Sequence, residues 1–378
     1  MFYRKTHFKA FFCAYILLSN FLCCQSFPCS RLPKRRTCNV ELHSSNSSDG
    51  ELNSTEPRIG FSFAPAGLLF PYHLGVAKML QESGVVDGGV PLAGASAGAL
   101  VAAVLGAEMD IDYVYQECKD LMRECRTQGT FSQMRGRLEA VLEGTLPQDI
   151  HERLNQREAP VGLAVTPLPS TLANTLYQRA PWFLGGTQAA PYSTVGKKRQ
   201  PFLRELRATI TDVIGRGSKT AGEDMDDYFG MLPRSTTVTK FESRQDVIEV
   251  LLASCNVPFW FDKVPTVTCR GTPAMDGMFG TYRLFWCPDV KTAEIVVKII
   301  PFYGTALLLE ALRLGQCISP GMGRFFPANI LGQLGRALWP SADAANDKMF
   351  RMGYEDAKTW FERAPFIPKR DSTFPGEV

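Results

Sequence analysis

The chain has 378 residues, 45% of them hydrophobic, which is enough to bury a sizeable core. Its 41 Lys and Arg residues nearly balance 38 Asp and Glu residues without a long basic run in the core, so the composition gives no sign of a nucleic-acid partner. Eleven cysteines are present without the paired spacing of a metal site, and we expect no metal ion. The six cysteines after the N-terminal region are predicted to be buried thiols. In a luminal protein, one or two disulfides among them are the alternative. These cysteines are Cys118, Cys125, Cys255, Cys269, Cys287 and Cys317.

Residues 1–26 have the pattern of a signal peptide. Basic residues precede an apolar run from Ala10 to Cys24, which is too short for a stable membrane anchor. The following stretch from Phe27 to Thr37 is basic, and it resembles the second part of the presequence that algae with complex plastids use. We therefore expect entry into the secretory system, with a plastid or another secretory compartment as the destination. Residues 27–57 are predicted to form a transit-like, disordered linker.

The first core elements are predicted directly after this linker. The segment Ile59 to Gly67 has the pattern of a strand that runs into a loop of small residues, and a helix is predicted from Tyr72 to Gln81. His73 lies at the start of this helix. We expect its ring to make a local hydrogen bond rather than to take part in chemistry.

A serine follows at the apex of a predicted turn between strand and helix. The small residues Gly94 to Gly98 join the apolar run Val90–Ala93 to the longer apolar run Ala99–Leu105. This is the pattern of a nucleophile elbow, in which Gly94 and Gly98 leave room for a sharp turn and Ser96 is held out at the start of a helix. Ser96 is therefore the candidate nucleophile.

The positions of the histidines argue against a Ser-His-Asp triad. In the common hydrolase with this elbow the histidine follows the serine at a distance, but the C-terminal half of this chain has no histidine. His151 does follow Ser96, but it stands in a charged stretch that is predicted to be a solvated helix face. The sequence therefore favours a serine that a carboxylate activates directly. The four histidines are His7, His43, His73 and His151.

A long insert separates two predicted strands. About seventy residues lie between the strand Val161–Val165 and the strand Thr236–Lys240, far more than a simple connection requires. The insert, about residues 168–235, contains the aromatic segment Trp182–Gly186 and a segment at 202–214 with its apolar residues on one helical face. We expect either a helix packed on the core or a lid that meets a membrane surface.

Asp276 is the carboxylate that best fits the role of base. Gly277 follows it and would let the backbone turn tightly beside the acid, although an Asp-Gly pair is also an ordinary turn signal. Asp262 and Asp289 lie in the same region without a following glycine and are the alternatives.

Taken together, these motifs resemble the patatin-like phospholipase family. The segment Phe63–Val76 is most similar to the adiponutrin and adipose triglyceride lipase branch of that family. The resemblance covers most of the chain from about Arg58 to Phe361. Further matching segments are Phe241–Arg244, Leu252–Pro258 and Gly353–Ala357.

The resemblance implies a three-layer α/β fold with a mostly parallel sheet and a Ser-Asp dyad formed by Ser96 and Asp276. It implies that the serine attacks an ester carbonyl to form an acyl-enzyme and that the aspartate accepts the proton. No metal and no organic cofactor are expected for this chemistry.

The resemblance also places the oxyanion-binding N–H groups in one loop. The candidates are the backbone N–H groups of Ala66, Gly67 and Leu68. Here the chain departs from the family pattern, which has glycines at the places of Pro65 and Phe70. Proline has no N–H to donate, and loss of one oxyanion donor lowers rates by about a hundredfold or more.

We therefore expect a hydrolase of fatty acyl esters of glycerolipids, with triacylglycerol, phospholipid and galactolipid all open as substrates. The alternatives are a transacylase with the same residues and a lipid-binding relative that has lost catalysis. The hydrolase domain is predicted over residues 58–366, with a tail at 367–378. The expected partner is a membrane or lipid droplet surface, and the oligomeric state is not readable from the sequence.

Overall fold

One sheet of eight strands organises the part of the chain that the computed structural model describes, namely residues 58–170, 173–174, 234–280, 287–290, 292–302, 316–321 and 330–364. The strand order is β5-β6-β3-β2-β1-β7-β8, and β4 pairs with β3. The strands are β1 (Ile59–Phe63), β2 (Leu92–Ala95), β3 (Val161–Pro167), β4 (Thr236–Val238), β5 (Val267–Cys269), β6 (Thr272–Asp276), β7 (Ile295–Ile299) and β8 (Cys317–Ile318).

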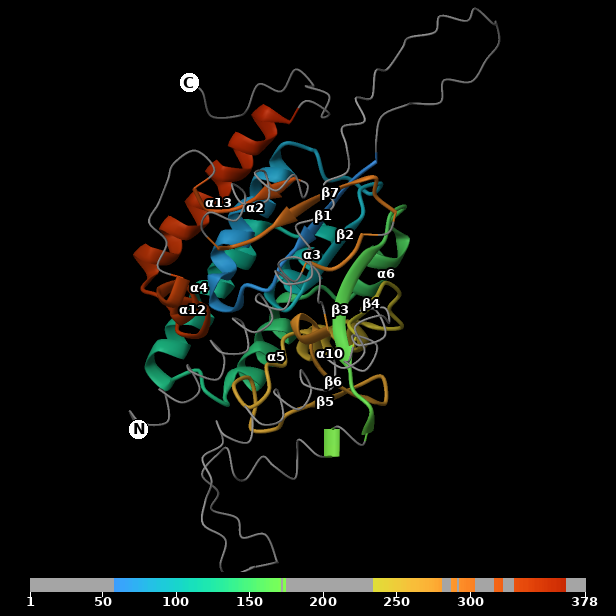
Figure 1. Ribbon diagram of the computed structural model, residues 1–378, viewed down its shortest axis with the longest axis vertical. Helices are drawn as coiled ribbons and strands as arrows, with labels where there is room; N and C mark the ends of the chain where they lie inside the picture. Colours follow the sequence, from blue (N-terminus) through green and yellow to red (C-terminus); the bar gives the residue numbers. More distant parts are fainter. Residues whose placement is uncertain are drawn as a thin grey trace, which may run out of the picture.

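Pairing is parallel from β3 through β2, β1 and β7 to β8, whereas β4, β5 and β6 pair antiparallel. The expected α/β architecture with a mostly parallel central sheet is confirmed (Figure 1). The helices are η1 (Gly67–Leu69), α2 (Phe70–Glu82), α3 (Ala97–Gly106), α4 (Ile111–Gln128), α5 (Met134–Thr145), α6 (Ile150–Gln156), α10 (Arg244–Ser254), η2 (Gly277–Gly280), α12 (Ile330–Leu338) and α13 (Asp343–Arg363).

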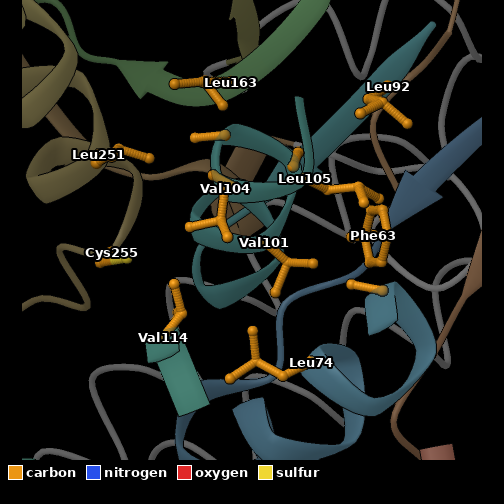
Figure 2. Packing of buried hydrophobic residues seen from close by; sticks show 14 of the residues in the cluster. Phe63, Leu74, Leu92, Val101, Val104, Leu105, Val114, Leu163, Leu251 and Cys255 are labelled. Carbon is orange, nitrogen blue, oxygen red and sulfur yellow. The ribbon is translucent and has the colours of Figure 1, made fainter. Parts of the chain in front are cut away.

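The apolar helix α3 lies at the centre of the core. Its sequence has no charged residue, and almost every side chain in it is buried, because β1, β2 and β3 lie on one side of it and α2 and α10 pack against others. Figure 2 shows side chains of α3 between those of α10 and Phe63 of β1. Burial on all sides fixes the start of α3, and Ser96 directly precedes that start.

Two glycines allow α2 and α13 to cross at backbone contact. A Cβ atom at Gly75 would overlap the carbonyl oxygen of Phe350, and one at Gly353 would overlap that of Tyr72. The two helices lie side by side in Figure 1. Helix α13 is therefore an integral part of the core.

Most predicted elements appear with small shifts of their ends. The helix predicted over Tyr72–Gln81 begins earlier, at Phe70, and the strand predicted to end at Val165 continues to Pro167. Nearly all of the predicted insert lies outside the described residues, as do the segment 202–214, the presequence and the tail.

Among the described helices, none combines the length and apolar character needed to cross a bilayer. The six cysteines predicted to be buried thiols are buried and unbridged.

Candidate active site

Ser96 occupies a strained turn between β2 and α3. Its backbone angles are φ 56° and ψ −131°, a region that residues other than glycine rarely adopt. A Cβ atom at Gly94 would overlap the carbonyl of Gly98, and one at Gly98 would overlap that of Phe63. The elbow that the sequence predicts is therefore present, and both of its glycines are required by close backbone contact.

A buried serine holds this turn from the other side. The backbone N–H of Ser96 donates to Ser254 Oγ at 3.0 Å, and the Ser254 hydroxyl donates to the carbonyl of Ala164 at 2.7 Å. Ser254 is completely buried at the end of α10. Sequence reasoning did not assign it a role, although it lies within the segment Leu252–Pro258 that carried part of the family resemblance.

Asp276 ends β6 and is completely buried. Its backbone N–H donates to the carbonyl of Asn256 at 2.9 Å, and its Oδ1 accepts the N–H of Met278 at 2.9 Å. Its other carboxylate oxygen, Oδ2, is buried without a hydrogen bond of ordinary geometry among the described residues. A Cβ atom at Gly277 would overlap the carbonyl of Ala164, so the glycine after the acid lets the chain turn against β3.

The structure brings Asp276 and Ser96 together. Burial raises the pKa of Asp276 to about 7, while the Met278 N–H and the Ser96 hydroxyl act in the opposite direction by stabilising the carboxylate. No hydrogen bond of ordinary geometry joins the two side chains among the described residues, and the hydrogen bonds of catalytic pairs often tighten only when substrate binds. A pKa near 7 suits a group that must accept and return a proton at neutral pH.

The side chain of Cys255 also lies beside Ser96 and Asp276. Burial raises the pKa of its thiol well above the usual range, the charge of Asp276 adds to this effect, and the Ser96 hydroxyl lowers the pKa. Cys255 is a buried thiol, as the sequence predicts, and it lies beside the candidate nucleophile. The neighbouring Asn256 is completely buried, and its side-chain Nδ2 donates to the carbonyl of Pro265 at 3.3 Å.

An apolar cavity opens from Ser96 between four helices. Its walls are almost entirely apolar. The residues Met134, Leu138 and Leu142 form one wall, since a spacing of four places them on the same side of α5. Side chains of α3, α4 and α10 form the others. The cavity suits a long apolar group attached to whatever reacts at Ser96.

The candidate oxyanion loop lines the same cavity. Within the described part of the chain, the N–H groups of Ala66, Gly67 and Leu68 have no hydrogen-bond acceptor. Ala97, the first residue of α3, also lines the cavity and packs in one apolar cluster with Ala66. Because Ala97 begins a helix, its N–H has no partner within that helix, and the residue after the nucleophile commonly donates to the oxyanion. The sequence analysis did not identify Ala97 as a candidate oxyanion donor, although its position directly after Ser96 was sufficient to indicate this role.

His73 supports this loop rather than the chemistry. Its Nε2 donates to the carbonyl of Ala64 at 2.8 Å, directly before Pro65. Burial lowers the pKa of His73 to about 4, against a smaller opposite effect of the hydrogen bond to Ala64, so the ring is neutral at physiological pH. The predicted local hydrogen bond is confirmed.

We expect His73 to make the protein less stable as the pH falls below about 6.5. The unfolded chain protonates this histidine near pH 6.5, whereas the folded chain resists protonation until about pH 4. The unfolded state therefore binds more protons in this range, and the free energy of unfolding falls by up to about 3 kcal/mol.

Urea unfolding at pH values from about 4 to about 7 measures this effect. Asp276 acts in the opposite direction because its pKa is raised, so the comparison must be made with a His73→Gln variant that retains Asp276. The variant should lose less stability on acidification than the wild type. Equal losses would show that His73 is not held as a buried neutral ring.

The alternative acids and His151 lie elsewhere. Asp262 is partly exposed with its Oδ2 3.9 Å from Arg135 Nη1, and Asp289 is exposed. His151 lies on α6 with 23% of its side chain exposed, so the predicted solvated face is only partly correct. None of the three lines the cavity.

The family described as Patatin, patatin-like phospholipase, matches residues 62–280, more than half of the chain, and this segment contains Ser96 and Asp276. No curated protein matches the chain.

Solved structures similar to this chain include VipD from Legionella pneumophila, which is 13% identical to it and superposes with a TM-score of 0.42. The match covers 81% of this chain and 67% of VipD. The type III effector ExoU matches in two crystal structures, each with 13% identity. The TM-score is 0.30 for one of them. It is 0.26 for the complex of full-length SpcU and full-length ExoU from Pseudomonas aeruginosa. Both ExoU matches cover 81% of this chain and 53% of ExoU, so this chain spans about half the length of that protein.

Proposed function

Because the chain belongs to the patatin-like phospholipase family, we propose that it hydrolyses fatty acyl esters of glycerolipids through Ser96 and Asp276. The observation that carries the proposal is the meeting of a strained serine with a buried aspartate beside an apolar cavity. A carboxylate whose pKa is near neutrality can act as the base for that serine without a histidine.

The reaction proceeds in two steps. Asp276 takes the proton of the Ser96 hydroxyl as Oγ attacks the ester carbonyl, and the proton then passes to the leaving alcohol as the acyl-enzyme forms. Asp276 next takes a proton from water, which attacks the acyl-enzyme and releases the fatty acid while Ser96 regains its proton. The N–H groups of Ala66, Gly67, Leu68 and Ala97 are the candidate donors to the oxyanion in both steps.

The cavity supports a fatty acyl chain as the group bound beside Ser96, since its walls are almost entirely apolar. Triacylglycerol, phospholipid and galactolipid all carry such chains, and the similarity of Phe63–Val76 to the adiponutrin and adipose triglyceride lipase branch supports including triacylglycerol. We propose that the enzyme meets these lipids at a membrane or droplet surface after entry into the secretory system by its N-terminal signal.

Labelling with a fluorophosphonate tests the proposal, because this probe reacts with an activated serine. The full-length protein should be labelled and should release fatty acid from phospholipid vesicles, and Ser96→Ala should abolish both. Wild-type protein that binds vesicles without labelling or release would instead be the lipid-binding relative. Pro65 is the observation in favour of that second function, because it cannot donate an N–H to the oxyanion.

The activity should depend on pH through Asp276. Only the ionised carboxylate can accept the proton of Ser96, so kcat/KM should fall about tenfold for each pH unit below about 7 and reach a plateau above it. Hydrolysis of a short soluble ester such as p-nitrophenyl butyrate measures this without an interface. A flat profile down to about pH 5 would show that no group with a raised pKa acts as the base.

A further inference from the structure

Glu117 is the one charged residue among the described residues that line the cavity. It lies on α4, where the lining residues Val114 and Cys118 are buried, whereas Glu117 itself is half-buried. This difference places the carboxylate at the edge of the apolar wall, where α4 reaches solvent. The cavity therefore carries its charge at its rim and not in its interior.

Glu117 has no ion-pair partner within the part of the chain that the structure describes. Each basic residue of α4 and α5 lies within ion-pair distance of a different acid. These pairs are Lys119–Asp347, Arg123–Asp120, Arg123–Asp343, Arg126–Asp343, Arg135–Asp262 and Arg137–Glu124. A carboxylate that is partly withdrawn from water and lacks a counter-charge attracts a cation to the rim of the cavity.

Tyr113 adds an aromatic ring beside this carboxylate. It lies four residues before Glu117, so the two side chains share one side of α4, and long side chains of a helix lean toward its N-terminus, here toward Tyr113. Tyr113 is 46% exposed, whereas Tyr115, the other tyrosine of α4, is buried and stacks on Phe350. An accessible ring next to a carboxylate without a counter-charge suits a quaternary ammonium group.

We propose that Tyr113 and Glu117 bind the trimethylammonium group of a choline head group, so that the preferred substrates are phospholipids with a cationic group beyond the phosphate. This inference rests on the proposed function, because it takes the acyl chain to lie in the cavity with its ester at Ser96. The head group then leaves through the open side of the cavity, past the rim that α4 forms. An anionic phospholipid has no cation to offset the repulsion between its phosphate and Glu117.

Binding to an inactive variant tests the proposal independently of catalysis. Full-length Ser96→Ala protein is titrated in a calorimeter with dihexanoyl phosphatidylcholine, phosphatidylethanolamine and phosphatidylglycerol, each below the concentration at which it forms micelles. The three lipids share their acyl chains and their phosphate, so the ratios of their affinities report the head group alone. Phosphatidylcholine should bind about tenfold more tightly than phosphatidylglycerol and about threefold more tightly than phosphatidylethanolamine.

Glu117→Gln in the same background keeps the shape of the side chain and removes its charge. It should reduce the preference for phosphatidylcholine over phosphatidylglycerol to less than about twofold. Glu139→Gln is the matched control, because Glu139 is a half-buried acid of α5 that also lacks an ion pair among the described residues but does not line the cavity. It changes the net charge equally, and the full preference should persist.

Substitutions of Tyr113 test the aromatic part of the site through the ratio of the affinities for phosphatidylcholine and phosphatidylethanolamine. Tyr113→Leu removes the ring and should make the two affinities equal. Tyr113→Phe keeps the ring and should keep the preference, because the attraction of the ring for the ammonium group does not require the hydroxyl.

The proposal would be overturned by equal affinities for phosphatidylcholine and phosphatidylglycerol, by a preference that survives Glu117→Gln, or by one that Glu139→Gln also removes. A ratio of phosphatidylcholine to phosphatidylethanolamine that Tyr113→Leu leaves unchanged would overturn it as well. Because Ser96→Ala cannot hydrolyse esters, these outcomes concern the head-group site alone. Failure of the proposed hydrolase would instead appear as absent fluorophosphonate labelling of the wild type, whatever the head-group preference.

Discussion

Replacing Asp276 by asparagine is expected to lower ester hydrolysis by about 10⁴-fold or more without unfolding the protein. The amide has the same shape as the carboxyl group, but it cannot accept the proton of Ser96. The fold should even gain stability above about pH 7, because burial disfavours the ionised carboxylate and asparagine carries no charge. The raised pKa corresponds to a gain of up to about 4 kcal/mol. An inactive variant that is more stable than the wild type at alkaline pH is thus the predicted result.

Matched substitutions separate this role from a general effect of lost acidic residues. Asp262→Asn and Asp289→Asn change acids that lie outside the cavity and should leave the rate within about threefold of the wild type. Initial rates of fatty acid release and urea unfolding of all three variants, at about pH 6 and about pH 8, measure both properties. If Asp276→Asn retained activity while either control lost it, the assignment of the base would be wrong.

Substitution of Gly353 by alanine is the second change with a large expected effect, this time on stability. The added Cβ would overlap the carbonyl of Tyr72, so α13 must move away from α2 along their whole crossing. Overpacking of this kind costs about 3 kcal/mol, which corresponds to a fall of about 5 to 10 °C in the unfolding temperature. Thermal unfolding followed by circular dichroism measures it.

Gly136→Ala provides the control for that experiment. Gly136 is an exposed residue of α5, and a Cβ there meets no atom within 4 Å. Alanine favours the helical backbone more than glycine does, so this variant should gain about 0.5 to 1 kcal/mol. Similar behaviour of the two alanine variants would show that α2 and α13 do not cross at backbone contact.

The sequence was most informative where chemistry depends on local backbone geometry. The pattern Gly94 to Gly98 identified a turn that only small residues allow, and the structure has that turn with Ser96 at its apex. The glycine after Asp276 likewise indicated a tight approach, although its contact with Ala164 of β3 was not predictable.

The support of the site was largely not predictable, because it depends on contacts between distant segments. Ser254 accepts a hydrogen bond from the Ser96 N–H across more than a hundred residues of chain, and a serine at the end of a helix gives no sign of this in the sequence. The same is true of the Cys255 thiol beside Ser96. Such roles follow from where the helices pack, which is a property of the whole fold.

The crossing of α2 with α13 also affects how the protein is made. Gly75 and Gly353 lie far apart in the described chain, so α2 is synthesised long before α13 and has no partner for its crossing face until α13 follows. The oxyanion loop shares this delay, because Gly67 packs against the backbone of Ala337 in α12. The candidate active site is therefore complete only after α12 has been synthesised and has packed against this loop.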